Sequence, residues 1–138
     1  MTMVFCSSGE SRVLDVFLNK ATPENMKMGL YSNSWLPAKS TVLGDLTEAT
    51  GGGYAKATLP NPTSWTVAAS NANGLAEATY DVRTWMFTAS IGNIHGYFVC
   101  GTTSDRLIWA EKFGDGPYPV VRSGDFLAVT PRFLVNSI

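Results

Sequence analysis

Few side chains in this sequence could carry out nucleophilic or acid–base chemistry, and their spacing keeps them apart. The chain has a single histidine, His95, and two cysteines, Cys6 and Cys100. A serine or cysteine nucleophile needs a neighbouring base, and His95 is the only imidazole that could serve. His95 and Cys100 are five positions apart in one apolar run, so a strand would place them on opposite faces. The sequence therefore predicts no nucleophile–base pair and no enzyme.

Metal and cofactor sites are not predicted either. One histidine and two distant cysteines form no cluster with the spacing of zinc ligands, and no Asp-x-Asp-x-Asp-Gly calcium loop occurs. The glycines at 51–53 lead into a strand-like segment rather than into Gly-Lys-Ser/Thr, so they predict the end of a loop and not a phosphate cradle. We expect no cofactor, and two reduced thiols of which Cys100 is a small core residue.

Composition bounds the class of protein. The chain has 138 residues, 45% of them apolar and only 15% charged, against about 25% charged in typical soluble domains. The net charge is −1 and the basic residues are scattered singly, which predicts no nucleic-acid partner. No apolar run reaches the length of a membrane span, and residues 1–5 do not resemble a secretory signal. A weakly charged surface is typical of a protein packed against other proteins, and equally of a neutral β domain.

The stretch from Thr84 to Phe113 predicts the sheet that must hold the fold together. It contains three runs rich in Trp, Phe, Tyr, Ile and Val, separated by turn-like breaks at 91–93 and 101–105. Trp85 and Trp109 lie within these runs, and we expect both in the core.

The remaining strands and turns predict the architecture. About nine short strands at regular spacing predict a mainly β single domain over residues 1–138, either a β-sandwich or a jelly-roll-like barrel. Trp65–Ala69 and Leu75–Tyr80 flank an Asn-rich turn and are expected to pair as a hairpin. Pro131 cannot donate a ladder hydrogen bond, so the last strand is expected at an edge or with a bulge there.

One short helix is expected near the N-terminus. Ser7 and Glu10 have the spacing of a capping box, which predicts a helix from about Glu10 to Lys20. Its apolar residues share one stripe, which we expect to lie against the sheet or against a neighbouring subunit. The stripe consists of Val13, Leu14, Phe17 and Leu18.

Two segments outside the predicted strands are candidate interfaces. Residues 34–53 have weak periodicity, and connections of this length are usually functional or disordered. The apolar cluster near the start of this loop favours an ordered arm that lies on the domain or on a partner, since tryptophan is enriched at interface centres. Residues 1–8 are expected to form an N-terminal arm. The candidate interface residues are Trp35, Leu36, Pro37, Tyr54, Val4 and Phe5.

The order of several short motifs resembles that of small virion proteins of tailed bacteriophages. The resemblance covers roughly Val13 to Val135. It rests on Met28–Asn33, Pro37, Asp45-Leu-Thr-Glu48, Gly52-Gly-Tyr54, Gly96-Tyr-Phe-Val99, Ala110-Glu-Lys-Phe113, Gly116-Pro117, Ser123-Gly-Asp-Phe126 and Val129-Thr-Pro131. Proteins of this kind are capsid decoration (cement) or tail-fibre-associated proteins, and the resemblance brings no catalytic residues with it.

This resemblance implies a non-enzymatic virion protein, made in the host cytoplasm. Its expected partners are the major capsid protein and copies of itself, as a dimer or trimer. A decoration protein that stabilises the head shell is the first hypothesis. A tail, neck or fibre component that contacts host surface glycans is the alternative, and a small hydrolase or a sugar-binding enzyme accessory is the third.

Overall fold

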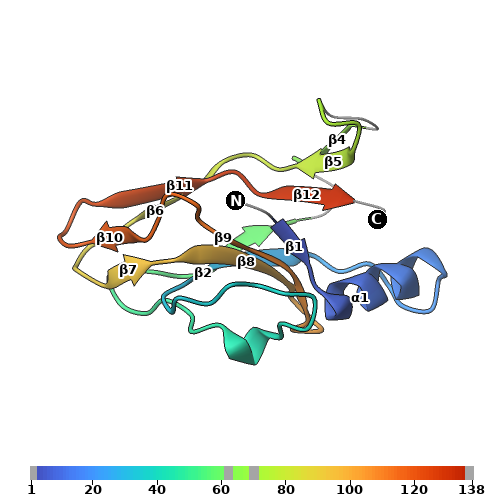
Figure 1. Cartoon of the computed structure of the whole chain (residues 1–138), viewed down its shortest axis with the longest axis horizontal. Helices are drawn as coiled ribbons and strands as arrows, with labels where there is room; N and C mark the ends of the chain where they lie inside the picture. Colours follow the sequence, from blue (N-terminus) through green and yellow to red (C-terminus); the bar gives the residue numbers. More distant parts are fainter. Residues whose placement is uncertain (1–2, 61–63, 69–71, 136–138) are drawn as a thin grey trace.

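The computed structural model describes residues 3–60, 64–68 and 72–135. Within these ranges the chain forms twelve β-strands, one α-helix and one short 3₁₀ helix. The strands lie in two layers that pack face to face (Figure 1). The described strands belong to separate sheets, none of which closes into a barrel. The prediction of a mainly β domain with one short N-terminal helix is therefore confirmed, in its sandwich form.

The first layer is a five-stranded antiparallel sheet in the order β1-β9-β8-β2-β3. Its two central apolar strands are almost wholly buried. Both faces of the sheet are covered, which explains why these strands are apolar along their length rather than at alternate positions. The strands are β1 (Met3–Phe5), β2 (Met26–Tyr31), β3 (Ala57–Leu59), β8 (Gly96–Gly101) and β9 (Leu107–Lys112).

The second layer is built from two smaller antiparallel sheets, β12-β5-β4 and β11-β6, and a further pair, β10-β7, lies at one end of the molecule. The predicted hairpin is confirmed, because β4 pairs with β5. The central stretch of the sequence contributes strands to both layers, since β6 pairs with β11 rather than with β8. These strands are β4 (Thr66–Ala68), β5 (Ala76–Thr79), β6 (Arg83–Met86), β7 (Gly92–Ile94), β10 (Tyr118–Val120), β11 (Phe126–Val129) and β12 (Arg132–Val135).

Pro131 separates β11 from β12. The Tyr80 N–H donates to the Pro131 carbonyl at 3.1 Å, between the β5–β12 and β6–β11 pairings. Proline contributes an acceptor but no donor at this point, so the ladder is interrupted there. The predicted irregularity at this proline is confirmed.

Side chains alternate across β8 between two buried clusters. Tyr97 and Val99 point between the layers, where they join Trp109 in the main core, whereas Phe98 and Cys100 point to the outer face. Trp109 is 1% exposed, and Trp85 is also buried. Both tryptophans are core residues, as predicted.

The 34–53 loop, which includes the 3₁₀ helix η1 (Leu43–Asp45), covers the outer face of the first sheet (Figure 1). The Ser32 N–H donates to the Thr47 carbonyl at 2.8 Å, and the Ala49 N–H donates to the Leu30 carbonyl at 2.9 Å. Of the two placements expected for this loop, the structure shows the first, because the loop lies on its own domain.

The described part of the N-terminal arm expected over residues 1–8 belongs to a strand and to the start of the helix. Residues 3–5 form β1, which pairs with β9 at the edge of the sheet, with Phe5 opposite Trp109. The helix α1 (Ser7–Phe17) follows at once. Backbone pairing with β9 therefore draws the described part of this segment into the fold.

The helix begins and ends earlier than predicted. Its N-cap is Cys6, and no side chain caps it, so the expected capping box is wrong. The Ser8 hydroxyl instead donates to the Leu107 carbonyl at 2.6 Å, a tertiary contact that ties the first turn to β9. The helix stops after Phe17, and Asn19 adopts a left-handed conformation with φ 59°, which asparagine tolerates well.

Candidate functional site, an apolar groove beside α1

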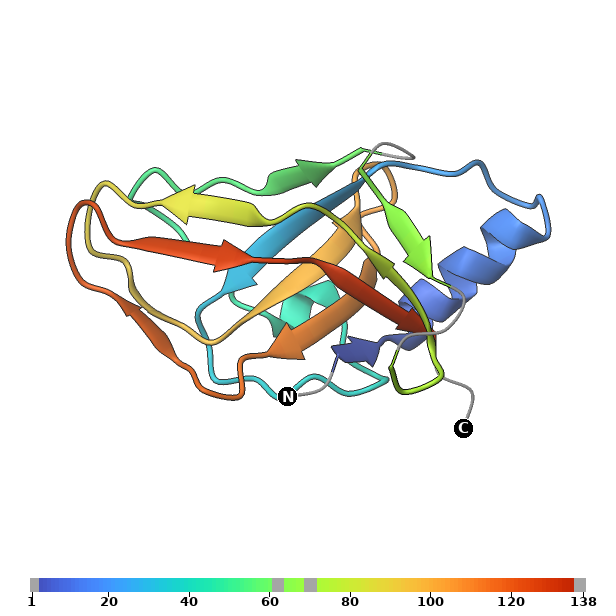
Figure 2. The ribbon, with the colours of Figure 1, turned by 90° about the horizontal axis from the view of Figure 1, so that it is seen from above.

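The first turn of α1 is pressed against the sheet at Gly9. A Cβ atom at this position would lie 2.3 Å from the carbonyl oxygen of Ile108, so no larger residue fits without moving the backbone. The close approach fixes one end of the helix on β9. The other end projects from the sandwich (Figure 2).

The polar side of α1 is bound to neighbouring loops. Arg12 Nη2 lies 2.5 Å from Glu24 Oε2, and Glu24 Oε1 accepts hydrogen bonds from the N–H groups of Thr103 (3.1 Å) and Ser104 (3.0 Å). Burial favours the neutral acid, but these hydrogen bonds and the Arg12 charge hold the pKa of Glu24 below its usual range. Asp15 and Arg106 form a second, longer pair at 3.6 Å.

The apolar side of α1 is exposed rather than packed against the sheet. The exposed fractions are 41% for Val13, 58% for Leu14, 83% for Phe17 and 59% for Leu18. The first of the two placements expected for this stripe is therefore wrong. The physical reason is that the close contact of Gly9 with Ile108, together with the ion pairs of Arg12 and Asp15, turns a different side of the helix toward the body of the protein.

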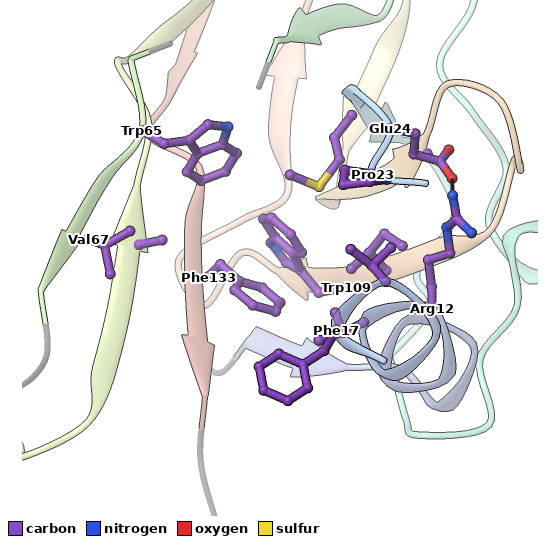
Figure 3. Close-up of a pocket in the computed structure, with 14 residues that line it drawn as sticks. Arg12, Phe17, Pro23, Glu24, Trp65, Val67, Trp109 and Phe133 are labelled. Carbon is purple, nitrogen blue, oxygen red and sulfur yellow. Dashed lines mark ion pairs between the residues drawn. The ribbon is translucent and has the colours of Figure 1, made fainter. Parts of the chain in front are cut away.

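An open groove of about 390 Å³ lies between α1 and the two layers (Figure 3). The helix supplies Val13, Val16 and Phe17 to one wall. The second layer supplies the opposite wall, and Trp109 of β9 lies between the two walls. The residues of the opposite wall include Trp65, Val67 and Phe133.

The groove is aromatic and carries almost no uncompensated charge. Its charged lining residues are Arg12 and Glu24, which pair with each other at one end (Figure 3). The rings of Trp109 and Phe133 are 4.7 Å apart, and Trp65 meets Trp109 edge-on at 6.4 Å. Aromatic pairs with edge-on and tilted geometry stabilise one another. Chemically, the groove can hold apolar groups but offers no nucleophile or base.

The predicted interface residues in the 34–54 region lie elsewhere, since none of them lines the groove. Leu36 is 75% exposed and Trp35 is 39% exposed, whereas Pro37 is buried. The Trp35 indole N–H donates to Thr41 Oγ1 at 3.2 Å. Tyr54 is half-buried, and its hydroxyl accepts from the Leu30 N–H and donates to Glu48, both at 3.0 Å.

Val4 and Phe5, the predicted interface residues of the N-terminal segment, are half-buried in β1. The Phe5 ring meets the ring of Phe133 edge-on at 4.8 Å. Because Phe133 lines the groove, Phe5 contacts a residue of the groove wall. The structure thus brings one of the six predicted interface residues into contact with the groove wall.

The potentially reactive groups do not converge within the part of the chain that the structure describes. Cys6 and Cys100 are free and buried, and burial raises the pKa of each thiol to about 11. Both thiols therefore stay protonated at neutral pH and are poor nucleophiles. His95 is half-buried between β7 and β8, where its backbone N–H donates to the Tyr31 carbonyl at 2.9 Å. No group of metal-ligating side chains is found among the described residues.

Sequence reasoning missed the wall of the groove opposite α1. Val67 and Phe133 occur in short apolar runs that predict strands, and nothing local shows that part of their surface stays open. The one signal in the sequence was the apolar stripe of the helix. Its second expected placement, against a neighbouring subunit, implied that apolar surface near the helix stays exposed in the isolated chain. The position of the second layer then decides how wide the groove is.

Comparisons with known proteins add no relative. No family model, no curated protein and no solved structure matches this chain. A search of the described helices finds none that combines the length and the apolar character of a membrane span.

Proposed function

We propose that this chain is a non-enzymatic structural protein of a phage virion, a capsid decoration (cement) protein that stabilises the head shell. In this proposal the α1 surface docks on neighbouring protein subunits, namely the major capsid protein and copies of this chain. The motif order between Val13 and Val135 supports the virion assignment, and the groove supports docking on protein.

The observation that carries the docking proposal is the exposure of the α1 stripe beside the groove. Large apolar side chains that form a continuous exposed patch are typical of protein-interaction sites. Here Leu14, Phe17 and Leu18 project from the helix, and the groove next to them is lined by aromatic rings. A ridge beside a groove suits a partner surface that has both an apolar projection and a depression.

The expected gain on docking is large enough to matter. Full burial of a leucine or phenylalanine side chain contributes roughly 1.5–3 kcal/mol, and every 1.4 kcal/mol changes an affinity about tenfold. Phe17 starts from 83% exposure, so a partner could cover almost all of it. Stable interfaces bury about 1,200–2,000 Å² in total, so the α1 surface would be the centre of a larger contact.

A second candidate function is supported by Trp35. In this alternative the chain is a tail, neck or fibre component that contacts host surface glycans. Trp35 is 39% exposed, and the hydrogen bond to Thr41 holds its ring in one orientation. A fixed, partly exposed indole offers a flat apolar face on which a sugar ring can stack.

The test uses particles that lack this chain and are then decorated with purified variants. Phe17→Glu should lower the affinity for the head at least tenfold, because a charge would have to be buried in the contact. Phe126→Glu is the matched control, since Phe126 is 66% exposed at the start of β11, at the opposite end of the sandwich from α1 (Figure 2). Its binding should match that of the wild type.

The same preparation separates the two candidate functions. Hundreds of bound copies per particle, with greater resistance of the head to heat, support decoration. A handful of copies at the tail, together with glycan binding that is lost in Trp35→Ala, supports the alternative. Equal binding of Phe17→Glu and the wild type would overturn the role of α1.

A further inference from the structure

A second opening of the sandwich has a different chemistry from the groove. A pocket of about 440 Å³ lies between the first sheet and the β11–β12 segment. Tyr97, Glu111 and Phe113 on the sheet side are buried, whereas Thr130 and Arg132 on the other side are exposed. The pocket therefore runs from an exposed polar rim to a buried floor.

Two polar groups on the floor lack a well-formed hydrogen bond. Glu111 is 4% exposed and Tyr97 is 1% exposed, and the two residues lie directly opposite each other on β9 and β8. Neither Glu111 Oε2 nor the Tyr97 hydroxyl has a hydrogen-bond partner within the described part of the chain. Buried polar groups are nearly always hydrogen-bonded, so an exception that lines a pocket calls for an explanation.

The uncompensated group is a carboxylate. Transfer of a charged carboxylate into a protein interior is unfavourable unless an opposite charge offsets it. Burial accordingly raises the pKa of Glu111, and both the positive charge of Arg132 and an interaction with the Tyr97 hydroxyl oppose that rise. Among the described residues no ion pair with Glu111 is formed, so Arg132 acts only from a distance.

Three aromatic residues, Tyr97, Phe113 and Tyr118, contribute to the lining of the pocket. The rings of Tyr97 and Phe113 are 6.2 Å apart, and those of Phe113 and Tyr118 are 5.0 Å apart. Aromatic faces attract cations through their quadrupole, most strongly when the contact is desolvated. A carboxylate among aromatic rings is the arrangement that recognises an organic ammonium group.

We propose that this pocket binds an alkylammonium group, of a free amine or of a lysine side chain on a partner protein, with Glu111 as its counter-ion. The ammonium N–H groups donate to the Glu111 carboxylate, and the attached methylene groups pack against the aromatic walls. An anion is disfavoured because it would approach the Glu111 carboxylate on the floor. This site is independent of the α1 groove, with which it shares no lining residue.

The test is a calorimetric and NMR titration with three probes of matched size, n-butylammonium, butyrate and butanol. Only n-butylammonium should bind with shifts at Tyr97 and Phe113. Glu111→Gln, which keeps the shape of the side chain, should lower its affinity at least tenfold. The exposed carboxylate variant Asp81→Asn is the control and should bind as the wild type does.

The variant Arg132→Gln tests whether the pocket prefers a cation or an anion. Removal of a like charge from the rim should raise the affinity for n-butylammonium severalfold, whereas an anion site would lose affinity. Tighter binding of butyrate, equal binding of butanol, or no binding of any probe would each overturn the proposal. Unchanged NMR spectra of the free variants establish that they are folded.

The source of the amine is distinguished by a second pair of probes. Binding of Nα-acetyl-lysine amide at least as tight as that of n-butylammonium supports a lysine side chain of a partner, and binding of the free amine alone supports a small molecule. Phe17→Glu should leave both affinities unchanged. Failure of the α1 docking proposal therefore does not affect this test.

Discussion

The two openings of the sandwich differ in how the charges of their carboxylates are compensated. Beside α1, Glu24 has Arg12 at 2.5 Å and two backbone N–H donors. In the pocket between the layers, Glu111 has no ion-pair partner among the described residues, and its Oε2 atom accepts no hydrogen bond there. One opening is thus electrostatically complete and the other is not.

This difference indicates what each surface is suited to bind. Arg12 and Glu24 neutralise each other in the α1 groove, so the rest of the groove presents aromatic and aliphatic surface. Such a surface is suited to contact with another protein. The Glu111 pocket keeps a charge that a small cationic group can neutralise. By the same comparison, Glu24 is a residue that stabilises the fold, whereas Glu111 is a residue that could bind a ligand.

The largest expected effect is the difference in unfolding free energy between variants in the buried part of the groove and variants on its exposed rim. Trp109→Ala should lower the free energy of unfolding by about 3–5 kcal/mol, because it removes a buried indole from the core. Phe17→Ala should change it by no more than about 0.5 kcal/mol, because the side chain is exposed. Denaturant unfolding measures both. A loss at Phe17 comparable with that at Trp109 would mean that the α1 stripe is core rather than a docking surface.

The next effect concerns the contact that holds α1 against the sheet. Gly9→Ala should cost about 1–3 kcal/mol, because the added methyl group meets the backbone of Ile108 and forces it to move. Gly44→Ala is the matched control, since a Cβ atom there meets nothing within 4 Å. Thermal unfolding of the two variants gives the comparison. Equal stability would show that the helix is not pressed on β9.

The two carboxylates should respond oppositely to loss of charge. Glu24→Gln should cost about 1–3 kcal/mol at neutral pH, because it weakens a paired and hydrogen-bonded group. Glu111→Gln should be neutral or stabilising, because it removes a buried charge that lacks a partner. Denaturant unfolding at pH 7 decides between these outcomes.

The pH dependence of the unfolding free energy tests the same difference between Glu24 and Glu111. The folded-state pKa of Glu24 is lowered, so its contribution is present above the unfolded pKa and is lost as the pH falls through the folded value. The folded-state pKa of Glu111 is raised, so its penalty is present above that value and is relieved as the pH falls toward the unfolded value. The wild type should therefore gain stability relative to Glu111→Gln, and lose stability relative to Glu24→Gln, as the solution is acidified. The same sign for both variants would contradict the comparison.

Much of the fold could be predicted from local patterns. The apolar runs that became β8 and β9 are strong strand signals, and the hairpin of β4 and β5 follows from its turn residues. The helix ends could not be predicted, because the predicted cap Ser7 is already the first helical residue, and the actual N-cap, Cys6, makes no side-chain capping hydrogen bond. The pairing of β6 with β11 could not be predicted either, because no local sequence pattern indicates in which layer a strand lies.

The candidate sites were harder to predict than the fold. The stripe of α1 was visible, but its exposure follows from the ion pairs of Arg12 and Asp15 with residues distant in sequence. Glu111 shares strand parity with Trp109 and Phe113, which is a signal of an inward-facing carboxylate in an apolar strand. Whether such a group lies in a pocket depends on the course of β11 and β12, which only the assembled sandwich shows.

The most direct test of the docking proposal is an image of the intact particle at a resolution that places this chain. We predict density of a neighbouring subunit over α1, with Phe17 enclosed between the two proteins. An α1 surface that faces solvent, while a different face of the sandwich contacts the particle, would contradict the proposal.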